Sequence, residues 1–80
     1  MVTKILRLPE VLLNRGRSRS AHYLDIQQEL FTRPIAIGLR AVGWPEHEVS
    51  ELNAARIAGK DSDAIRQLVK DLEAARKGQH

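Results

Sequence analysis

Residues 16–20 are Gly16-Arg17-Ser18-Arg19-Ser20, and they separate two short segments of helical pattern. Glycine suits the position just past the end of a helix, because it adopts a left-handed backbone at little cost. Ser18 or Ser20 suits the start of the next helix, because a serine hydroxyl accepts a hydrogen bond from a free amide of the first turn. The stretch therefore predicts two helices joined by a turn of about three residues, a helix-turn-helix.

The flanking segments support this prediction. Upstream, residues 4–8 are a short extended candidate, and Pro9 suits the first turn of a helix that ends near Asn14. Downstream, a helix is expected from about Ser20 to Glu29, with a buried side marked by Tyr23, Ile26 and Leu30.

A β-hairpin is predicted after the second helix. Residues 34–38 and 40–44 are two short strand candidates, and Gly38-Leu39 suits a two-residue turn between them. This places Arg40 beside the tip of the hairpin. A helix-turn-helix followed by a hairpin is the arrangement of a winged helix, whose second helix enters the major groove of DNA.

Two more helices are expected, one beginning at Pro45 and one over residues 61–76. The sequence thus predicts a mostly α-helical winged helix-turn-helix domain with a small β-hairpin over residues 1–60. Residues 61–80 would add an amphipathic C-terminal helix and tail. The apolar stripe of that helix is either an oligomerisation seam or a face packed on the core of the chain itself; it consists of Ile65, Leu68, Val69 and Leu72, continued by Ala75.

Composition bears on the classes of function. The 80 residues include no cysteine, which removes disulfide frameworks, zinc fingers and thiol catalysis. His22, His47 and His80 are too scattered for a metal site, and no phosphate-binding loop or nucleophile motif is present. No apolar run approaches a membrane span. We therefore expect a soluble cytoplasmic protein that is not an enzyme, with no cofactor, metal or small-molecule substrate.

Positive charge gathers in the first half of the chain. Residues 1–40 carry seven basic and three acidic side chains, and six of the seven basic ones are arginines, the usual readers of phosphate and guanine. The candidate DNA contacts are Arg17, Ser18, Arg19, Ser20, His22, Tyr23, Arg33 and Arg40. Alternatives stay open for several of them. The serines can simply cap the helix, Arg40 can solubilise an edge strand, and Tyr23 and His22 can be core residues.

Several ordered pieces of sequence over roughly residues 6–57 carry a resemblance to a known family. The most telling is the block Arg40-Ala41-Val42-Gly43-Trp44. The other pieces are Arg7-Leu8-Pro9-Glu10-Val11, Gly16 to Ser20 followed by Tyr23, Phe31 with Pro34-Ile35, and Glu48-Val49. In this order and spacing they resemble the AlpA family of prophage regulatory proteins. This family looks like a compact relative of excisionases and MerR-type winged helices. The chain departs from the family pattern at His22, where members have an apolar residue, and at Glu29 and Leu39, where they have glycine.

The resemblance implies a small DNA-binding regulator of a phage, prophage or integrative element. It would bind double-stranded DNA, control transcription or direct excision, and associate with the nucleoid. Because a single small module buries only about 600–1,000 Å² on DNA, we expect a homodimer or a cooperative array on repeated sites. The rival interpretation is a protein-interaction module, such as an antirepressor or adaptor, that keeps the fold. The acidic end of the second helix and the apolar stripe of residues 61–76 motivate it.

Overall fold

A computed structural model describes residues 4–78 of the chain. Most of this part is helical, and a small antiparallel sheet accompanies the helices. In chain order the elements are β1 (Ile5–Leu6), α1 (Leu8–Arg15), α2 (Arg19–Gln27), β2 (Ile35–Ala36), β3 (Val42–Pro45), α3 (Glu46–Ile57), α4 (Ser62–Ala75) and a final 3₁₀ turn, η1 (Arg76–Gly78).

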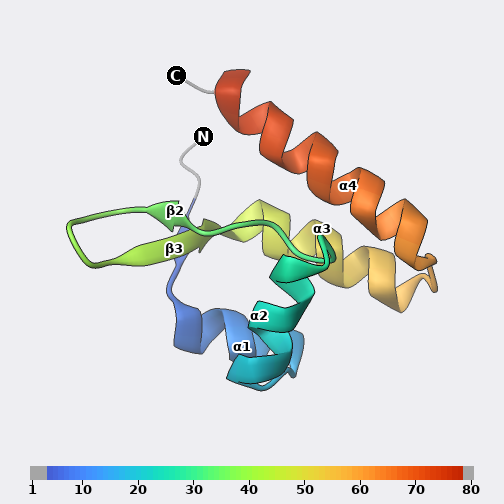
Figure 1. Cartoon of the computed structure of the whole chain (residues 1–80), viewed down its shortest axis with the longest axis horizontal. Helices are drawn as coiled ribbons and strands as arrows, with labels where there is room; N and C mark the ends of the chain where they lie inside the picture. The colour runs from blue at the N-terminus through green and yellow to red at the C-terminus, as the bar shows by residue number, and fades with distance from the viewer. Residues whose placement is uncertain (1–3, 79–80) are drawn as a thin grey trace.

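Helix α3 lies at the centre of the arrangement. It contacts α1 on one side and α4 on another, and β3 leads directly into it (Figure 1). The strands form a sheet in the order β1-β3-β2, so β3 is the middle strand. In Figure 1 the loop that joins β2 to β3 projects away from the helices.

A single hydrophobic core joins these elements. The indole Nε1–H of Trp44 donates a hydrogen bond of 2.9 Å to the Thr32 carbonyl, which ties β3 to the segment after α2. The predicted boundary at residue 60 falls in the turn between α3 and α4, but both sides of it contribute to this core. Its buried apolar members are Leu6, Val11, Phe31, Trp44, Val49, Leu52, Ile65, Val69 and Leu72.

The turn between α1 and α2 has the predicted structure. Gly16 takes a left-handed conformation with φ 65°, and its N–H donates to the Leu12 carbonyl at 2.9 Å. The Ser18 hydroxyl then accepts a hydrogen bond from the Ala21 amide at 3.2 Å and caps α2. Both caps follow from local physical chemistry, and this is why the sequence alone located them.

The register of the β2–β3 hairpin differs from the prediction. Ile35 pairs with Gly43, and the Ile37 amide donates to the Ala41 carbonyl at 2.9 Å. The connection is therefore the three-residue loop 38–40, not the two-residue turn Gly38-Leu39. Because side chains alternate along a strand, this shift by one residue exchanges the faces that oppose one another across the hairpin. It also places Arg40 within the loop itself.

Strand β1 pairs with the opposite edge of β3. Leu6 pairs with Trp44 in the sheet, and both side chains are buried in the core. The sequence indicated an extended segment at this place but not its partner. Gly43 then faces Ile5 on the other side of the sheet, where a Cβ atom would lie 2.6 Å from Ile5 Cγ2 and 2.9 Å from the Leu6 carbonyl oxygen.

The stripe on α4 faces the interior of the molecule. Ile65, Val69 and Leu72 are buried core residues, and Leu68 packs against them while partly exposed. Of the two predicted alternatives, the structure therefore has the stripe packed on the core of the chain itself. The stripe is not an open oligomerisation seam. The expectation that these four residues drive self-association is corrected accordingly.

Candidate nucleic-acid interface

One face of α2 is open to solvent. Its exposed side chains recur at helical spacing and form a continuous strip along the helix: Arg19, Ser20, Tyr23, Leu24 and Gln27. Tyr23 is 39% exposed and Leu24 50%. Two of the three residues expected on the buried side of α2, Ile26 and Leu30, pack against the core. The third expectation is wrong, since Tyr23 belongs to the outer face and the adjacent His22 to the inner one.

The amino-terminal end of this strip suits an anion. Free amides and the helix dipole make the start of a helix attractive to phosphate. Arg19 and Ser20 stand there, and within residues 4–78 no hydrogen bond or salt bridge holds either side chain. Both are thus available to a ligand that approaches the first turn of α2.

Beneath the strip lies a buried charged cluster centred on Asp25. Its carboxylate accepts hydrogen bonds from Arg15 Nη2 at 2.7 Å and from Arg17 Nε and Nη2 at 3.1 and 2.9 Å. Arg56 Nη2 from α3 is 4.0 Å away. Burial alone would raise the pKa of Asp25, but the hydrogen bonds from Arg15 and Arg17 hold it below its usual value. With three guanidinium groups around one carboxylate, the cluster keeps an excess of positive charge behind α2.

His22 forms the apolar side of the same cluster. It is completely buried, and its ring lies edge-on to Phe31 and Trp44 at centroid distances of 5.1 and 4.9 Å. Arg15 Nη1 lies 2.8 Å from His22 Nδ1, and because arginine only donates, Nδ1 is the acceptor. Burial, together with the adjacent charge of Arg15, lowers the pKa of His22 to about 4, so the ring is neutral at pH 7. The expected contact of His22 with DNA is therefore wrong, since its side chain has no accessible surface.

Arg17 also differs in role from the expectation. Two of its nitrogens are already engaged by Asp25 across the turn between α1 and α2. Its side chain nevertheless remains 40% exposed. Arg17 therefore holds α2 against the turn and adds positive potential there, while Arg19 carries the unengaged guanidinium.

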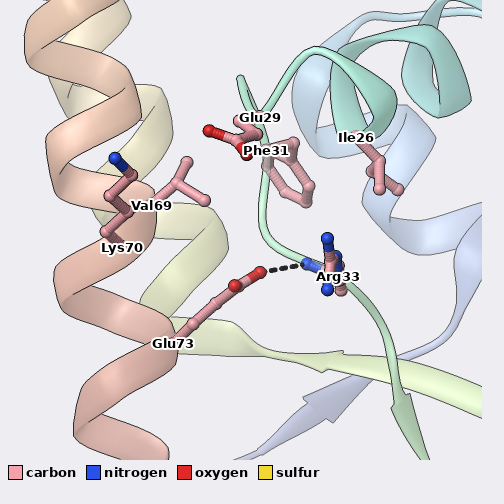
Figure 2. Close-up of a pocket in the computed structure, with 7 residues that line it drawn as sticks. All are labelled: Ile26, Glu29, Phe31, Arg33, Val69, Lys70 and Glu73. Atoms are coloured by element: carbon pink, nitrogen blue, oxygen red, sulfur yellow. Dashed lines mark hydrogen bonds between the residues drawn. The ribbon is translucent and has the colours of Figure 1, made fainter.

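Arg33 lies apart from the start of α2. It follows the carboxyl end of that helix, where its amide donates to Glu73 at 2.8 Å and its carbonyl accepts from Arg76 Nη2 at 2.7 Å. Figure 2 shows Arg33 at a small cavity of about 90 Å³ between α4 and the segment after α2. Small-molecule sites are typically several times larger. Arg33 thus borders the α4 side of the molecule and is not gathered with Arg19.

Arg40 occupies the loop of the β2–β3 hairpin. Its side chain is exposed, and in the part of the chain that the structure describes it has no salt bridge. The hairpin is anchored at its base by the pairing of β3 with β1 and by the Trp44–Thr32 hydrogen bond. A free cation at the end of a supported loop can enter a narrow groove or meet a phosphate.

Sequence reasoning missed Leu24 and Gln27 as members of the exposed strip. Helical spacing from Arg19 and Ser20 would have found them, but the apolar character of Tyr23 set the phase of the helix instead. It also missed the role of Asp25, which counted as an acidic surface residue opposed to DNA. Asp25 is in fact buried and more than neutralised by its arginine partners.

Metal-ligating clusters and membrane-spanning helices are both absent from residues 4–78. No group of histidine, aspartate or glutamate side chains there could hold a metal ion. None of the helices described is long and apolar enough to cross a membrane.

Fold and site together define a small, mostly helical protein that presents a capped helix with a positive environment at its start. Comparison with known proteins agrees with this class. The family described as "Prophage CP4-57 regulatory protein (AlpA)" matches residues 4–57, and the chain belongs to this family of phage regulatory proteins. The match includes α1, α2, the hairpin and α3 and ends before α4.

The chain is also similar to the uncharacterized protein ORF88 of Enterobacteria phage P4. The two are 39% identical over 57 residues, which is 71% of this chain and 65% of that relative. About a third of the relative therefore has no counterpart in the alignment. No solved structure matches the chain significantly.

Proposed function

We propose that the chain is a winged helix-turn-helix protein that binds double-stranded DNA. The exposed strip of α2 enters the major groove, with Arg19 and Ser20 leading, and the β2–β3 hairpin acts as the wing on the adjacent backbone or minor groove. The observation that carries this proposal is the start of α2. There an unengaged Arg19 and Ser20 stand over a buried cluster whose net charge is positive.

The chemistry of the strip fits the reading of base edges. Arg19 can donate two hydrogen bonds to guanine, Gln27 can pair with adenine, and Leu24 can contact a thymine methyl group. Tyr23 can donate to a phosphate through its hydroxyl. The strip thus offers specificity as well as charge, which a merely basic surface does not.

The proposed biological role follows from binding and not from catalysis. We infer a regulator of transcription or an excision-directing factor of a phage, prophage or integrative element, acting in the cytoplasm on nucleoid DNA. Membership of the AlpA family supports this role. A single module of this size buries only about 600–1,000 Å² on DNA, which favours a homodimer or cooperative array on repeated sites.

The observations that favoured the rival role, a protein-interaction module, are weakened. Asp25 is neutralised in the interior and most of the apolar stripe of α4 packs on the core, whereas Glu29 after the end of α2 stays exposed. A DNA-capture experiment separates the two roles. Sheared genomic DNA from the source organism is incubated with the immobilised protein at low and moderate salt, and the recovered fragments are sequenced.

The wild-type chain should enrich a few short repeated sites, and recovery should fall steeply with salt. Arg19→Ala should weaken binding to an enriched site by about 1–3 kcal/mol and relax the preference at one base pair. The matched control is Lys60→Ala, which removes one exposed positive charge from the turn between α3 and α4. If the two variants lose equal DNA-binding affinity, binding depends only on the overall positive charge of the protein and not on a specific contact of Arg19. Uniform recovery with no enriched site would refute sequence-specific binding.

A further inference from the structure

The loop of the β2–β3 hairpin carries a leucine at its end. Leu39 is the middle residue of the loop 38–40 and is fully exposed, the most accessible large apolar residue among those described. Exposed single leucines are common on protein surfaces. Leu39 is different because it stands at the tip of a projecting element, beside the unpaired cation Arg40.

The rest of the hairpin surface is apolar as well. Ile37 is 40% exposed and Val42 38%, and Arg40 is the only charged side chain in residues 35–45. A hairpin suited solely to phosphate contacts would carry several donors and cations. This hairpin offers one cation and an apolar tip. Such a tip suits the base pairs inside a DNA groove better than the phosphates along its edges.

We propose that Leu39 inserts between two base pairs from the minor groove and acts as a wedge, with Arg40 bound in the groove beside it. Apolar side chains used in this way unstack one base step and kink the duplex by about 20–90°. The proposal rests on the proposed function, because it requires that the hairpin reach DNA. It adds that the protein deforms its site and does not only read it.

The base of the hairpin is built to support such a wedge. Unstacking costs a few kcal/mol per step, so a loop on a yielding support would bend back instead of inserting. Here β3 is held between β1 and β2, and Gly43 allows Ile5 to approach the backbone closely. The hydrogen bond from Trp44 to Thr32 anchors the end of the same strand to the core.

The test uses the full chain and a short duplex that contains an enriched site from the capture experiment. The adenines of the site are replaced one at a time by 2-aminopurine, whose fluorescence rises when it is unstacked. Bending is measured in parallel by energy transfer between dyes at the two ends. The variants are Leu39→Ala and, as the matched control, Ile57→Ala, which shortens another highly exposed aliphatic side chain at the end of α3.

The wild-type chain and Ile57→Ala should raise the fluorescence several-fold at one base step and bend the duplex. Leu39→Ala should lose most of both signals while keeping the urea midpoint of the wild type, because its side chain makes no core contact. The Arg40→Ala variant should instead weaken binding and reduce its salt dependence.

Four results would overturn the inference, the last of them together with the proposed function. Binding of the wild type without unstacking at any step would refute it and leave the proposed function intact. Retention of the fluorescence signal by Leu39→Ala would do the same. A loss of protein copies on the duplex with Leu39→Ala, at an unchanged bend, would assign the leucine to a protein contact. If the capture experiment enriches no site, the proposed function and this inference fail together.

Discussion

Mild acid should destabilise this protein through one buried histidine. The pKa of His22 is lowered from its ordinary 6.5 to about 4, so between these values the unfolded chain binds a proton that the folded chain does not. The free energy of unfolding must therefore fall as the pH drops below 6.5. Below about pH 4 both states bind the proton, so His22 causes no further fall. The contribution of His22 to stability is fully present only above pH 6.5.

The size of the effect follows from the shift. Each pKa unit corresponds to about 1.36 kcal/mol, so moving from pH 7 to pH 5 should cost about 2 kcal/mol. This window isolates the histidine, because the linkage of Asp25 begins only near its unfolded pKa of 3.8 and then runs to lower pH. For a chain this small, with a urea slope of about 1 kcal/mol per molar, the urea midpoint should move by about 2 M.

The assay is urea unfolding followed by far-UV circular dichroism at several pH values between 7 and 5. His22→Gln keeps an acceptor for Arg15 but cannot titrate, so its midpoint should vary much less with pH. The matched control is His47→Gln, which removes a second imidazole and leaves the contact between Arg15 and His22 in place. A wild-type midpoint that stays constant over this range, or an equal dependence in His22→Gln, would refute the assignment of a neutral buried His22.

Three further changes test the packing, each by urea unfolding at pH 7. Arg76→Ala should cost about 3 kcal/mol, because it leaves the fully buried Glu48 carboxylate without its two hydrogen bonds, and adding Glu48→Gln should restore part of the loss. Gly43→Ala should cost about 2 kcal/mol, since the new Cβ would meet the Leu6 carbonyl oxygen at 2.9 Å. Glu29→Gly should stabilise the fold by about 1 kcal/mol, because residue 29 has φ 62° and glycine adopts this conformation freely. A stable Arg76→Ala, a neutral Gly43→Ala or a destabilised Glu29→Gly would each contradict the corresponding contact or conformation.

The last of these changes also gives a physical reason for one departure from the family pattern. The resemblance placed glycine where this chain has Glu29, and the structure shows the left-handed backbone that a glycine would suit. The Leu30 amide donates to the Asp25 carbonyl at 2.7 Å and closes the end of α2 around this residue. The chain thus keeps the left-handed backbone of this turn with a glutamate, Glu29, a residue type that does not favour that conformation.

Local signals determined most of the secondary structure from sequence alone. Pro9 and Gly16 bound α1, Ser18 caps α2, and Asp61 caps α4 by accepting from the Ala64 amide at 2.8 Å. Each signal acts over a few residues and depends on no distant contact, so it can be recognised without the fold. The order of the elements followed from the same local patterns. The family resemblance over residues 6–57 rested on ordered sequence pieces, and the family match over residues 4–57 confirms it.

Only the tertiary structure decided which faces these elements present. Hydropathy placed Tyr23 inside, left the burial of His22 open and counted Asp25 as a surface acid. The buried carboxylate is stable only because Arg15 and Arg17 reach it from across the turn, and Arg15 also donates to His22 Nδ1. The pairing of β3 with β1, a strand distant in sequence, likewise could not be predicted from local patterns. The sequence by itself therefore determined where most of the helices and strands lie, while tertiary packing decided which side chains stay exposed, among them Arg19 and Leu39.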